Sequence, residues 1–224
     1  MISNNKICVA IIDYELGNMF SVKKACDIIG LDATITNDKH ALMKSDAAIL
    51  PGVGAFGDAM NNLHRLDLVE PIKDFIQSKK QFFGVCLGLQ LLFSESEEFG
   101  SFGGLNIVDG MVKQFPKNNK KIKVPQIGWN FARKAPMTSN ETWNVSPMHN
   151  INTEQRMYFV HSYYVISTDA TKVLTQTNYE GTDYCSSIFI DNVYATQFHP
   201  EKSSDEGLKI YKNWANKITH TREV

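Results

Sequence analysis

The stretch Gln81–Phe93, QFFGVCLGLQLLF, decides our prediction of the fold. Its first part, Gln81–Val85, is a short apolar run typical of a buried strand, and Leu87–Phe93 has the length and composition of a helix. Cys86 therefore lies at a strand-to-helix corner, with one glycine two residues before it and another two residues after it. A corner of this kind indicates an α/β fold.

Strand and helix patterns also alternate before this corner. The predicted elements are, in chain order, a strand at Ile7–Ile12, a helix at Asn18–Ile29, a weak strand at Thr34–Thr36, a strand at Ala47–Leu50 and one or two helices within Asp58–Ser78, interrupted near Pro71. We expect the interruption there because a proline in a helix interior removes a backbone hydrogen bond. The alternation predicts a mainly parallel sheet flanked by helices.

The pattern changes beyond Gly100, where predicted strands follow one another with little helix between them. We expect these strands to form antiparallel hairpins. A closing helix at Asp205–Ile218 is predicted from apolar residues at spacings of three and four. Because no repeat or long linker divides the chain, we expect residues 1–224 to form a single domain. The predicted strands are Met111–Phe115, Tyr158–Ile166, Val173–Thr177, Ser186–Ile190 and Val193–Gln197.

Composition and charge narrow the classes of function. The formal net charge of −1 over 224 residues provides no basic excess for binding nucleic acid or an anionic membrane. The polar segment Met1–Lys6 leads into the apolar run Ile7–Ile12, which is too short for a secretory core or a membrane span. We therefore expect a cytoplasmic protein that acts on a small molecule.

The cysteines and histidines lack the spacing of metal ligands. Four cysteines lie far apart without a CxxC pair, which argues against a zinc site and against a disulfide framework. We therefore expect no metal and no cofactor. Any cysteine chemistry should use a single thiol.

Cys86 is the candidate nucleophile. A cysteine flanked in this way matches the thiol form of the nucleophile elbow, where larger flanking residues would collide with the neighbouring strand and helix. The start of the following helix favours a thiolate, and the Leu87 amide can donate a hydrogen bond to an oxyanion. A buried structural cysteine between two glycines is the alternative interpretation.

A thiol nucleophile needs a base, and His199 is the best candidate among six histidines. It directly follows a predicted strand, which places it at the carboxyl edge of the sheet. Glu201 can turn back to orient the imidazole, as the third member of a triad does. His161 also follows a strand and can line the same cleft. The remaining histidines are interpreted as ordinary polar residues: His40, His64, His149 and His220.

A third motif, Pro51-Gly52-Val53-Gly54, follows the apolar strand that ends at Leu50. Its two glycines allow the backbone to approach a ligand and to turn an amide toward a developing negative charge. By itself the motif fits a plain tight turn more often than a binding loop. It is no dinucleotide-binding fingerprint, because the third glycine and the spacing are absent.

Together these three motifs resemble those of the class I, triad-type glutamine amidotransferases. Within that family the sequence is most similar to the glutaminase subunits of imidazole glycerol phosphate synthase, and the similarity covers nearly the whole chain. The resemblance implies a flavodoxin-like fold with a central, mainly parallel sheet and an antiparallel extension in the C-terminal half. The blocks that carry it are IDY at 12–14, GN at 17–18, LPGVGAFGDA at 50–59, QIGWN at 126–130, YFVHS at 158–162 and QFHPEKSS at 197–204.

The resemblance also implies a role for each matching residue. Cys86 would attack the glutamine carboxamide and form a glutamyl thioester. His199 would protonate the departing ammonia and then activate water, while Glu201 would orient His199. The other implied sites are the oxyanion donors Leu87, Gly52, Val53 and Gly54, the glutamine-binding residues Gln90, Glu98, Ser162 and Tyr163, and the partner-contacting residues Trp129, Asn130, Tyr158 and Lys202.

The implied partner is a (β/α)8-barrel synthase subunit, which would receive ammonia through a sealed passage that keeps it unprotonated. In the histidine-pathway version, the barrel makes imidazole glycerol phosphate and an aminoimidazole carboxamide nucleotide. Two departures from the subfamily leave the acceptor open. Gln126, near the implied interface, replaces a usual histidine, and Glu15-Leu16 replace small residues. The alternative is a paralogue that supplies ammonia to a barrel homologue for amidine formation in surface-glycan biosynthesis.

Two other classes of protein compete with this interpretation. A cysteine peptidase or hydrolase of flavodoxin-like shape would keep the corner and a histidine, but it would not need the Pro51 loop, the Trp129-Asn130 block or His199-Pro200-Glu201. A degenerate amidotransferase that only binds a partner predicts a broken triad, whereas Cys86, His199 and Glu201 are all present.

Overall fold

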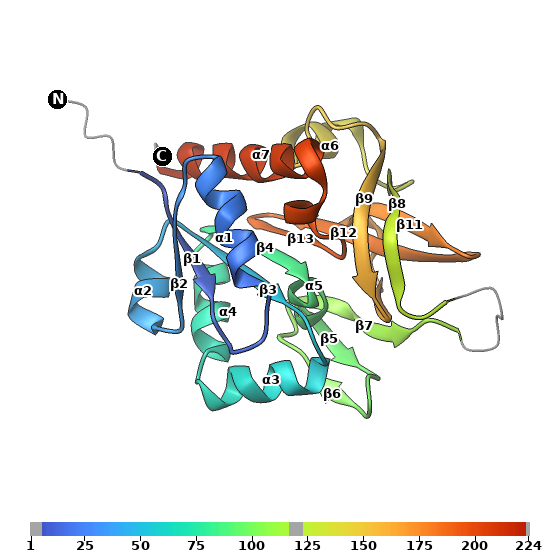
Figure 1. Ribbon diagram of the computed structural model, residues 1–224, viewed down its shortest axis with the longest axis horizontal. Helices are drawn as coiled ribbons and strands as arrows, with labels where there is room; N and C mark the ends of the chain where they lie inside the picture. The colour runs from blue at the N-terminus through green and yellow to red at the C-terminus, as the bar shows by residue number, and fades with distance from the viewer. Residues whose placement is uncertain (1–5, 117–122, 223–224) are drawn as a thin grey trace.

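The first half of the chain alternates strands and helices in a computed structural model that describes residues 6–116 and 123–222 (Figure 1). Except for Lys6, the polar N-terminal segment lies outside the described residues. The alternation predicted from the sequence is confirmed, including the corner at Cys86. The elements are β1 (Cys8–Ile12), α1 (Met19–Ile28), β2 (Asp32–Thr36), α2 (Lys39–Lys44), β3 (Ala47–Gly52), α3 (Phe56–Arg65), α4 (Val69–Gln77), β4 (Gln81–Cys86) and α5 (Leu87–Leu91).

Strands dominate the second half, as predicted. The last helix, α7, covers and extends the predicted closing helix. The elements are β5 (Phe93–Ser96), β6 (Phe102–Gly103), β7 (Val108–Gln114), β8 (Gln126–Lys134), α6 (Asn140–Val145), β9 (Glu154–His161), β10 (Tyr163–Ser167), the 3-10 helix η1 (Ala170–Lys172), β11 (Val173–Tyr179), β12 (Thr182–Ile190), β13 (Val193–Thr196), the 3-10 helix η2 (Pro200–Lys202) and α7 (Ser204–Arg222).

All of these strands belong to one mixed sheet, whose main path runs β2-β1-β3-β4-β13-β12-β10-β7-β5-β6. Neighbouring strands are parallel from β2 to β13. From β13 to β12 and on to β10 and β7 they are antiparallel, and β11, β8 and β9 branch from β12 as further antiparallel strands. The predicted parallel sheet with an antiparallel C-terminal extension is confirmed.

Helices cover both faces of the parallel part of the sheet. Helices α1 and α7 lie on one face, and α2, α3 and α4 lie on the other (Figure 1). Strand β1 shows why, since Val9 and Ile11 belong to the apolar cluster beneath α1 and α7, whereas Ala10 and Ile12 belong to the opposite cluster. Side chains of a strand point alternately to the two faces, so an all-apolar strand requires cover on both.

The core beneath α7 is built around Phe83 of β4. Its ring centroid lies 5.0 Å from that of Tyr194, 5.2 Å from Tyr211 and 5.5 Å from Trp214. All four side chains are buried. The predicted apolar face of the closing helix is therefore confirmed, and it packs directly against the strand that carries Cys86.

Two predicted helix boundaries are wrong. The helix after Cys86 ends at Leu91 instead of Phe93, because the carbonyl of Leu91 accepts a hydrogen bond from Leu105 N at 2.8 Å. The interruption expected near Pro71 lies earlier, between α3 and α4. Pro71 itself occupies the first turn of α4, where a backbone N–H has no partner within the helix.

The strand predictions also differ from the structure, because β5, β6 and the part of β12 before Ser186 were missed. The strand expected over Tyr158–Ile166 is two strands separated at Ser162, and that break becomes part of the cavity described below. Strand β8 was not predicted. Gly128, at a φ of +127°, and Asn130 interrupt its apolar pattern, so pairing with β9 and β11 determines its conformation.

We predict that Phe83→Ala lowers the free energy of unfolding by about 3–5 kcal/mol, because a buried aromatic side chain is lost and a cavity remains. The matched control is Phe20→Ala on α1, where the side chain is 79% exposed and the expected change is within about 0.5 kcal/mol. Urea unfolding followed by circular dichroism measures both. Equal losses in the two variants would contradict the assigned core.

Candidate active site

Strand register brings the carboxyl ends of β3, β4 and β13 together. Gly52 of β3 is paired with Cys86 of β4, and Thr196 of β13 is paired with Val85. His199 follows three residues after Thr196. Residues from widely separated parts of the chain therefore meet at one edge of the sheet, as the sequence predicts.

Cys86 has a strained backbone conformation. Its φ of +56° and ψ of −105° lie in a region that residues with a side chain rarely adopt, and such strain is concentrated at functional sites. The turn is possible because Gly88 lacks a side chain, since a Cβ there would lie 1.8 Å from the carbonyl oxygen of Leu50. The steric reason given above for the flanking glycines is thus visible in the packing.

His199 and Glu201 form a buried pair behind Cys86. His199 Nδ1 lies 2.7 Å from Glu201 Oε1, and the two side chains are 2% and 1% exposed. Because a carboxylate only accepts hydrogen bonds, Nδ1 carries the proton. Nε2 has no hydrogen-bond partner among the described residues. It is therefore the ring nitrogen that remains available for proton transfer.

The charges around His199 favour its protonated form. Burial alone lowers its pKa, but interaction with Cys86 and then with Glu201 outweighs burial and raises the pKa of His199 to about 10. A protonated imidazole beside a cysteine sulfur is an arrangement that supports nucleophilic attack by that sulfur.

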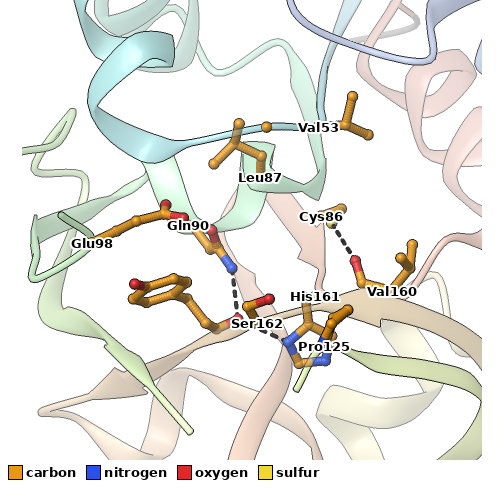
Figure 2. A pocket seen from close by; sticks show the side chains of 11 residues that line it. Val53, Cys86, Leu87, Gln90, Glu98, Pro125, Val160, His161 and Ser162 are labelled. Carbon is orange, nitrogen blue, oxygen red and sulfur yellow. Dashed lines mark hydrogen bonds between the residues drawn. The ribbon is translucent and has the colours of Figure 1, made fainter. Parts of the chain in front are cut away.

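The Cys86 sulfur has two further polar neighbours. Its Sγ lies 3.8 Å from the Val160 carbonyl oxygen (Figure 2), and Gln197 Nε2 donates to Sγ at 3.7 Å. Sequence reasoning assigned no role to Gln197. Its position two residues before His199, at the end of a predicted strand, was the sequence signal that could have indicated its place in the site, and the structure buries it fully.

A cavity of about 290 Å³ opens beside Cys86 (Figure 2). Its size suits a small molecule. Pro125, Val160 and His161 line it together with most of the predicted oxyanion and glutamine-binding residues. Those predicted residues are Val53, Gly54, Leu87, Gln90, Glu98, Ser162 and Tyr163. Gly52, His199 and Glu201 do not line this cavity, but they line a separate, smaller space.

The polar groups of the cavity are held in place by the protein. Gln90 Nε2 donates to the Tyr163 carbonyl at 2.9 Å and to Gln197 Oε1 at 3.1 Å. Glu98 Oε2 accepts from Phe56 N at 2.7 Å, and burial raises the pKa of Glu98. The cavity is therefore lined by oriented amide and carboxylate groups before any ligand enters.

Three of the four predicted partner-contacting residues form a surface cluster. Trp129, which is 51% exposed, is paired with Tyr158 across β8 and β9, and their ring centroids are 6.2 Å apart. Lys202 Nζ lies 5.9 Å from the Tyr158 ring centroid. Asn130 is engaged elsewhere, because its Nδ2 donates to the Asn178 carbonyl at 2.9 Å and joins β8 to β11.

The structure places the Gln126 side chain in the interior, whereas the resemblance implied a position near a partner surface. Alternation along β8 turns Ile127 and Trp129 outward, with 62% and 51% of their surface exposed, and turns Gln126 inward, where it is 2% exposed. It lies directly opposite His161 in the pairing of β8 with β9. Gln126 therefore belongs to the interior behind the cavity.

Within residues 6–116 and 123–222, no group of three or more His, Cys, Asp and Glu side chains is arranged to hold a metal ion. The four cysteines are free thiols, and only Cys8 is exposed. None of the described helices combines the length and the apolarity needed to cross a membrane.

Solved structures with the same fold support this architecture. The structure of PurLQS from Thermotoga maritima aligns over 95% of this chain and 99% of its own, with a TM-score of 0.72 and 18% identity. The glutaminase domain of CTPS from Trypanosoma brucei aligns over 96% and 94%, with a TM-score of 0.67 and 14% identity. At these identities the likeness concerns the fold alone.

Sequence comparisons identify the family of this chain. Residues 11–218 match the model of glutamine amidotransferase class-I. The chain is 43% identical over 215 residues to the imidazole glycerol phosphate synthase subunit HisH of Syntrophotalea carbinolica, covering 93% of this chain and 99% of that protein. It is also 43% identical over 211 residues to the HisH of Aquifex aeolicus, covering 92% and 95%. This chain belongs to the class-I glutamine amidotransferase family.

Proposed function

We propose that this chain is the glutamine-hydrolysing subunit of an imidazole glycerol phosphate synthase and supplies ammonia to a (β/α)8-barrel subunit in histidine biosynthesis. Relatives with that name match it over more than nine tenths of both chains. The observation that supports this chemistry is the buried His199–Glu201 pair. It leaves His199 Nε2 without a described partner, and Cys86 has a strained backbone. We further propose that residues 1–224 form one domain, since a single sheet joins both halves, and that the protein is cytoplasmic, where free thiols persist.

The first half of the reaction forms a thioester. The ionised Cys86 sulfur attacks the carboxamide carbon of glutamine, and the carbonyl electron pair moves onto oxygen. The Leu87 N–H and an amide of the loop Gly52–Gly54 donate to this oxyanion. Protonated His199 then gives its Nε2 proton to the leaving nitrogen, so ammonia departs and the glutamyl thioester remains.

The second half releases glutamate. Neutral His199 accepts a proton at Nε2 from a water molecule, and the resulting hydroxide attacks the thioester carbon. The carbon–sulfur bond breaks, and Cys86 leaves as a thiolate. Throughout, Glu201 accepts from Nδ1–H at 2.7 Å, which keeps Nε2 as the reacting nitrogen and stabilises the imidazolium.

Glutamine would bind in the cavity beside Cys86. We assign Gln90, Glu98, Ser162 and Tyr163 to its recognition, because all four line the cavity. The Glu98 carboxylate provides a negative charge for the substrate ammonium group, and the Phe56 N–H holds one of its oxygens. This arrangement limits the reorganisation needed when glutamine binds.

The barrel would dock on the surface cluster of Trp129, Tyr158 and Lys202, with Asn130 beside it. Tyr158 connects this surface to the catalytic pair, since its carbonyl accepts from His199 N at 2.9 Å and its own N–H donates to Ser203 Oγ at 3.0 Å. Ser203 Oγ in turn donates to the His199 carbonyl at 2.7 Å. A shift of Tyr158 on contact with the barrel can therefore move the backbone of His199 through these hydrogen bonds.

We predict that Cys86→Ala reduces glutamate release from glutamine by about 10³-fold or more, because no other thiol replaces the nucleophile. The pKa of His199, followed by NMR, should fall from its raised value of about 10 because interaction with Cys86 raises it. The matched control is Cys185→Ala, which removes a buried thiol outside the cavity. Activity retained in Cys86→Ala would contradict the assignment of the nucleophile.

A second experiment tests the partner. Glutamate release is measured for this chain alone, with its organism's histidine-pathway barrel subunit, and with that subunit plus the aminoimidazole nucleotide acceptor. We expect strong stimulation by the barrel and acceptor together. Trp129→Ala should weaken stimulation by about tenfold, whereas Met137→Ala, which removes another exposed apolar side chain, should not. No stimulation of a folded, Cys86-intact chain would instead favour the surface-glycan paralogue.

A further inference from the structure

A buried chain of hydrogen bonds joins Gln126 to the wall of the cavity. The Tyr184 hydroxyl oxygen lies 2.9 Å from Gln126 Oε1 and 3.2 Å from His161 Nε2. His161 Nδ1 lies 2.8 Å from the Tyr163 carbonyl oxygen. Gln126, Tyr184 and His161 are 2%, 2% and 6% exposed. Because water cannot replace these contacts easily, each polar group needs a partner of the right kind.

The Tyr163 carbonyl determines which tautomer of His161 is present. A carbonyl oxygen only accepts, so His161 Nδ1 must carry a proton. Burial lowers the pKa of His161 to about 4, against the opposing effect of its bond to Tyr163, so the ring is neutral near pH 7. A neutral imidazole has one N–H, and Nε2 is therefore an acceptor. The hydrogen-bonding group beside it is the Tyr184 hydroxyl.

The Tyr184 hydroxyl has one proton, for which His161 Nε2 and Gln126 Oε1 compete, and the Thr177 hydroxyl is a further polar neighbour. When the proton points to Oε1, His161 Nε2 lacks a donor and Gln126 Nε2 has no partner within the described part of the chain. A half-turn of the Gln126 amide leaves one unpaired atom instead of two, because Oε1 then takes the position at which Nε2 lacks a described partner. Its Nε2 then donates to Tyr184, and Tyr184 donates to His161 Nε2. Because leaving a buried polar group unpaired is unfavourable, the arrangement with one unpaired atom is favoured over the arrangement with two.

The chain continues from the Tyr163 carbonyl toward the nucleophile. This carbonyl accepts from Gln90 Nε2 as well as from His161 Nδ1, at 2.9 and 2.8 Å. Gln90 also donates to Gln197 Oε1, and Gln197 Nε2 lies 3.7 Å from Cys86 Sγ. Figure 2 shows Gln90 and His161 approaching the Ser162 segment from opposite sides. Two donors therefore hold the peptide that lines the cavity.

We propose that Gln126, Tyr184 and His161 are positioning residues for glutamine. Gln126 and Tyr184 hold His161 as its Nδ1–H tautomer, and His161 in turn holds the Tyr163 peptide against Gln90. The three residues act on the substrate through the Ser162–Tyr163 wall of the cavity. This inference rests on the proposed hydrolysis of glutamine, and it gives the inward-facing Gln126 a role in the active site.

Steady-state glutamine hydrolysis, assayed with the barrel and acceptor, tests the proposal. Tyr184→Phe and His161→Leu should raise the KM for glutamine about tenfold, with a smaller change in kcat, because they disturb the cavity wall and leave Cys86 and His199 in place. Gln126→Met should change KM in the same direction. Tyr194→Phe is the matched control. It likewise removes one buried tyrosine hydroxyl, but the Tyr194 hydroxyl has no partner among the described residues, so this variant should behave as wild type.

His161→Asn separates positioning from packing. The asparagine Nδ2 can donate to the Tyr163 carbonyl and has no tautomers, so this variant should stay within about threefold of the wild-type KM. Adding Tyr184→Phe to His161→Asn should cause no further loss, although Tyr184→Phe alone does. Equal effects of Tyr184→Phe in the wild-type and His161→Asn backgrounds would overturn the proposed positioning role of Gln126, Tyr184 and His161. Wild-type kinetics in any of the variants Tyr184→Phe, His161→Leu and Gln126→Met would also overturn it.

The ¹⁵N shifts of His161 report its tautomer without any assay of glutamine. We expect a protonated Nδ1 and an unprotonated Nε2 in the wild type, and a mixture of tautomers in Tyr184→Phe. A protonated Nε2 in the wild type would overturn the proposal. If the wild-type complex does not hydrolyse glutamine, the proposed function fails. If the wild-type complex hydrolyses glutamine and the variants have the wild-type KM, only the positioning role of the three residues is refuted.

Discussion

The turn at Cys86 is the constraint on which the site depends. The chain leaves β4 with φ at +56° and enters α5 at once, so a thiol stands at the carboxyl edge of the sheet beside the first N–H groups of a helix. The close approach of Gly88 to the Leu50 carbonyl means that β3, β4 and α5 must pack together for this turn to exist. The core around Phe83, on the same strand, provides the support that strained backbone requires.

Burial of the His199–Glu201 pair has a cost and a use. Removing an imidazole and a carboxylate from water is unfavourable, and one short hydrogen bond offsets only part of that penalty. In return, the low-polarity surroundings strengthen the attraction between His199 and Cys86, which raises the pKa of His199 despite its burial. Because β13 is parallel to β4, the pair is delivered to the edge of the sheet where Cys86 stands. The charged pair therefore depends on the same strand order as the strained turn.

The antiparallel extension provides the wall of the cavity opposite α5. Val160, His161 and Ser162 come from the end of β9 and the break before β10, and they close the cavity opposite α5. The same strand carries Tyr158 on its outer side, where it meets Trp129 of β8. One strand thus touches both the cavity and the surface assigned to the partner. Gln126 of β8 lies opposite His161 of β9 on the inner face of the same two strands, so β8 and β9 carry both the surface assigned to the partner and groups behind the cavity.

The amino-acid sequence by itself determined the parallel half of the sheet, the corner at Cys86 and the candidates His199 and Glu201. These features follow from local periodicity and from motifs whose chemistry needs particular residue types at short spacing. Strand β8, the break at Ser162, the roles of Gln197 and Tyr184 and the inward orientation of Gln126 were decided only by tertiary structure. Each of them depends on pairing between residues far apart in the chain, such as Gln126 with His161. A polar side chain on a strand faces solvent or the interior according to which face its neighbours cover, and that information is absent from the local pattern.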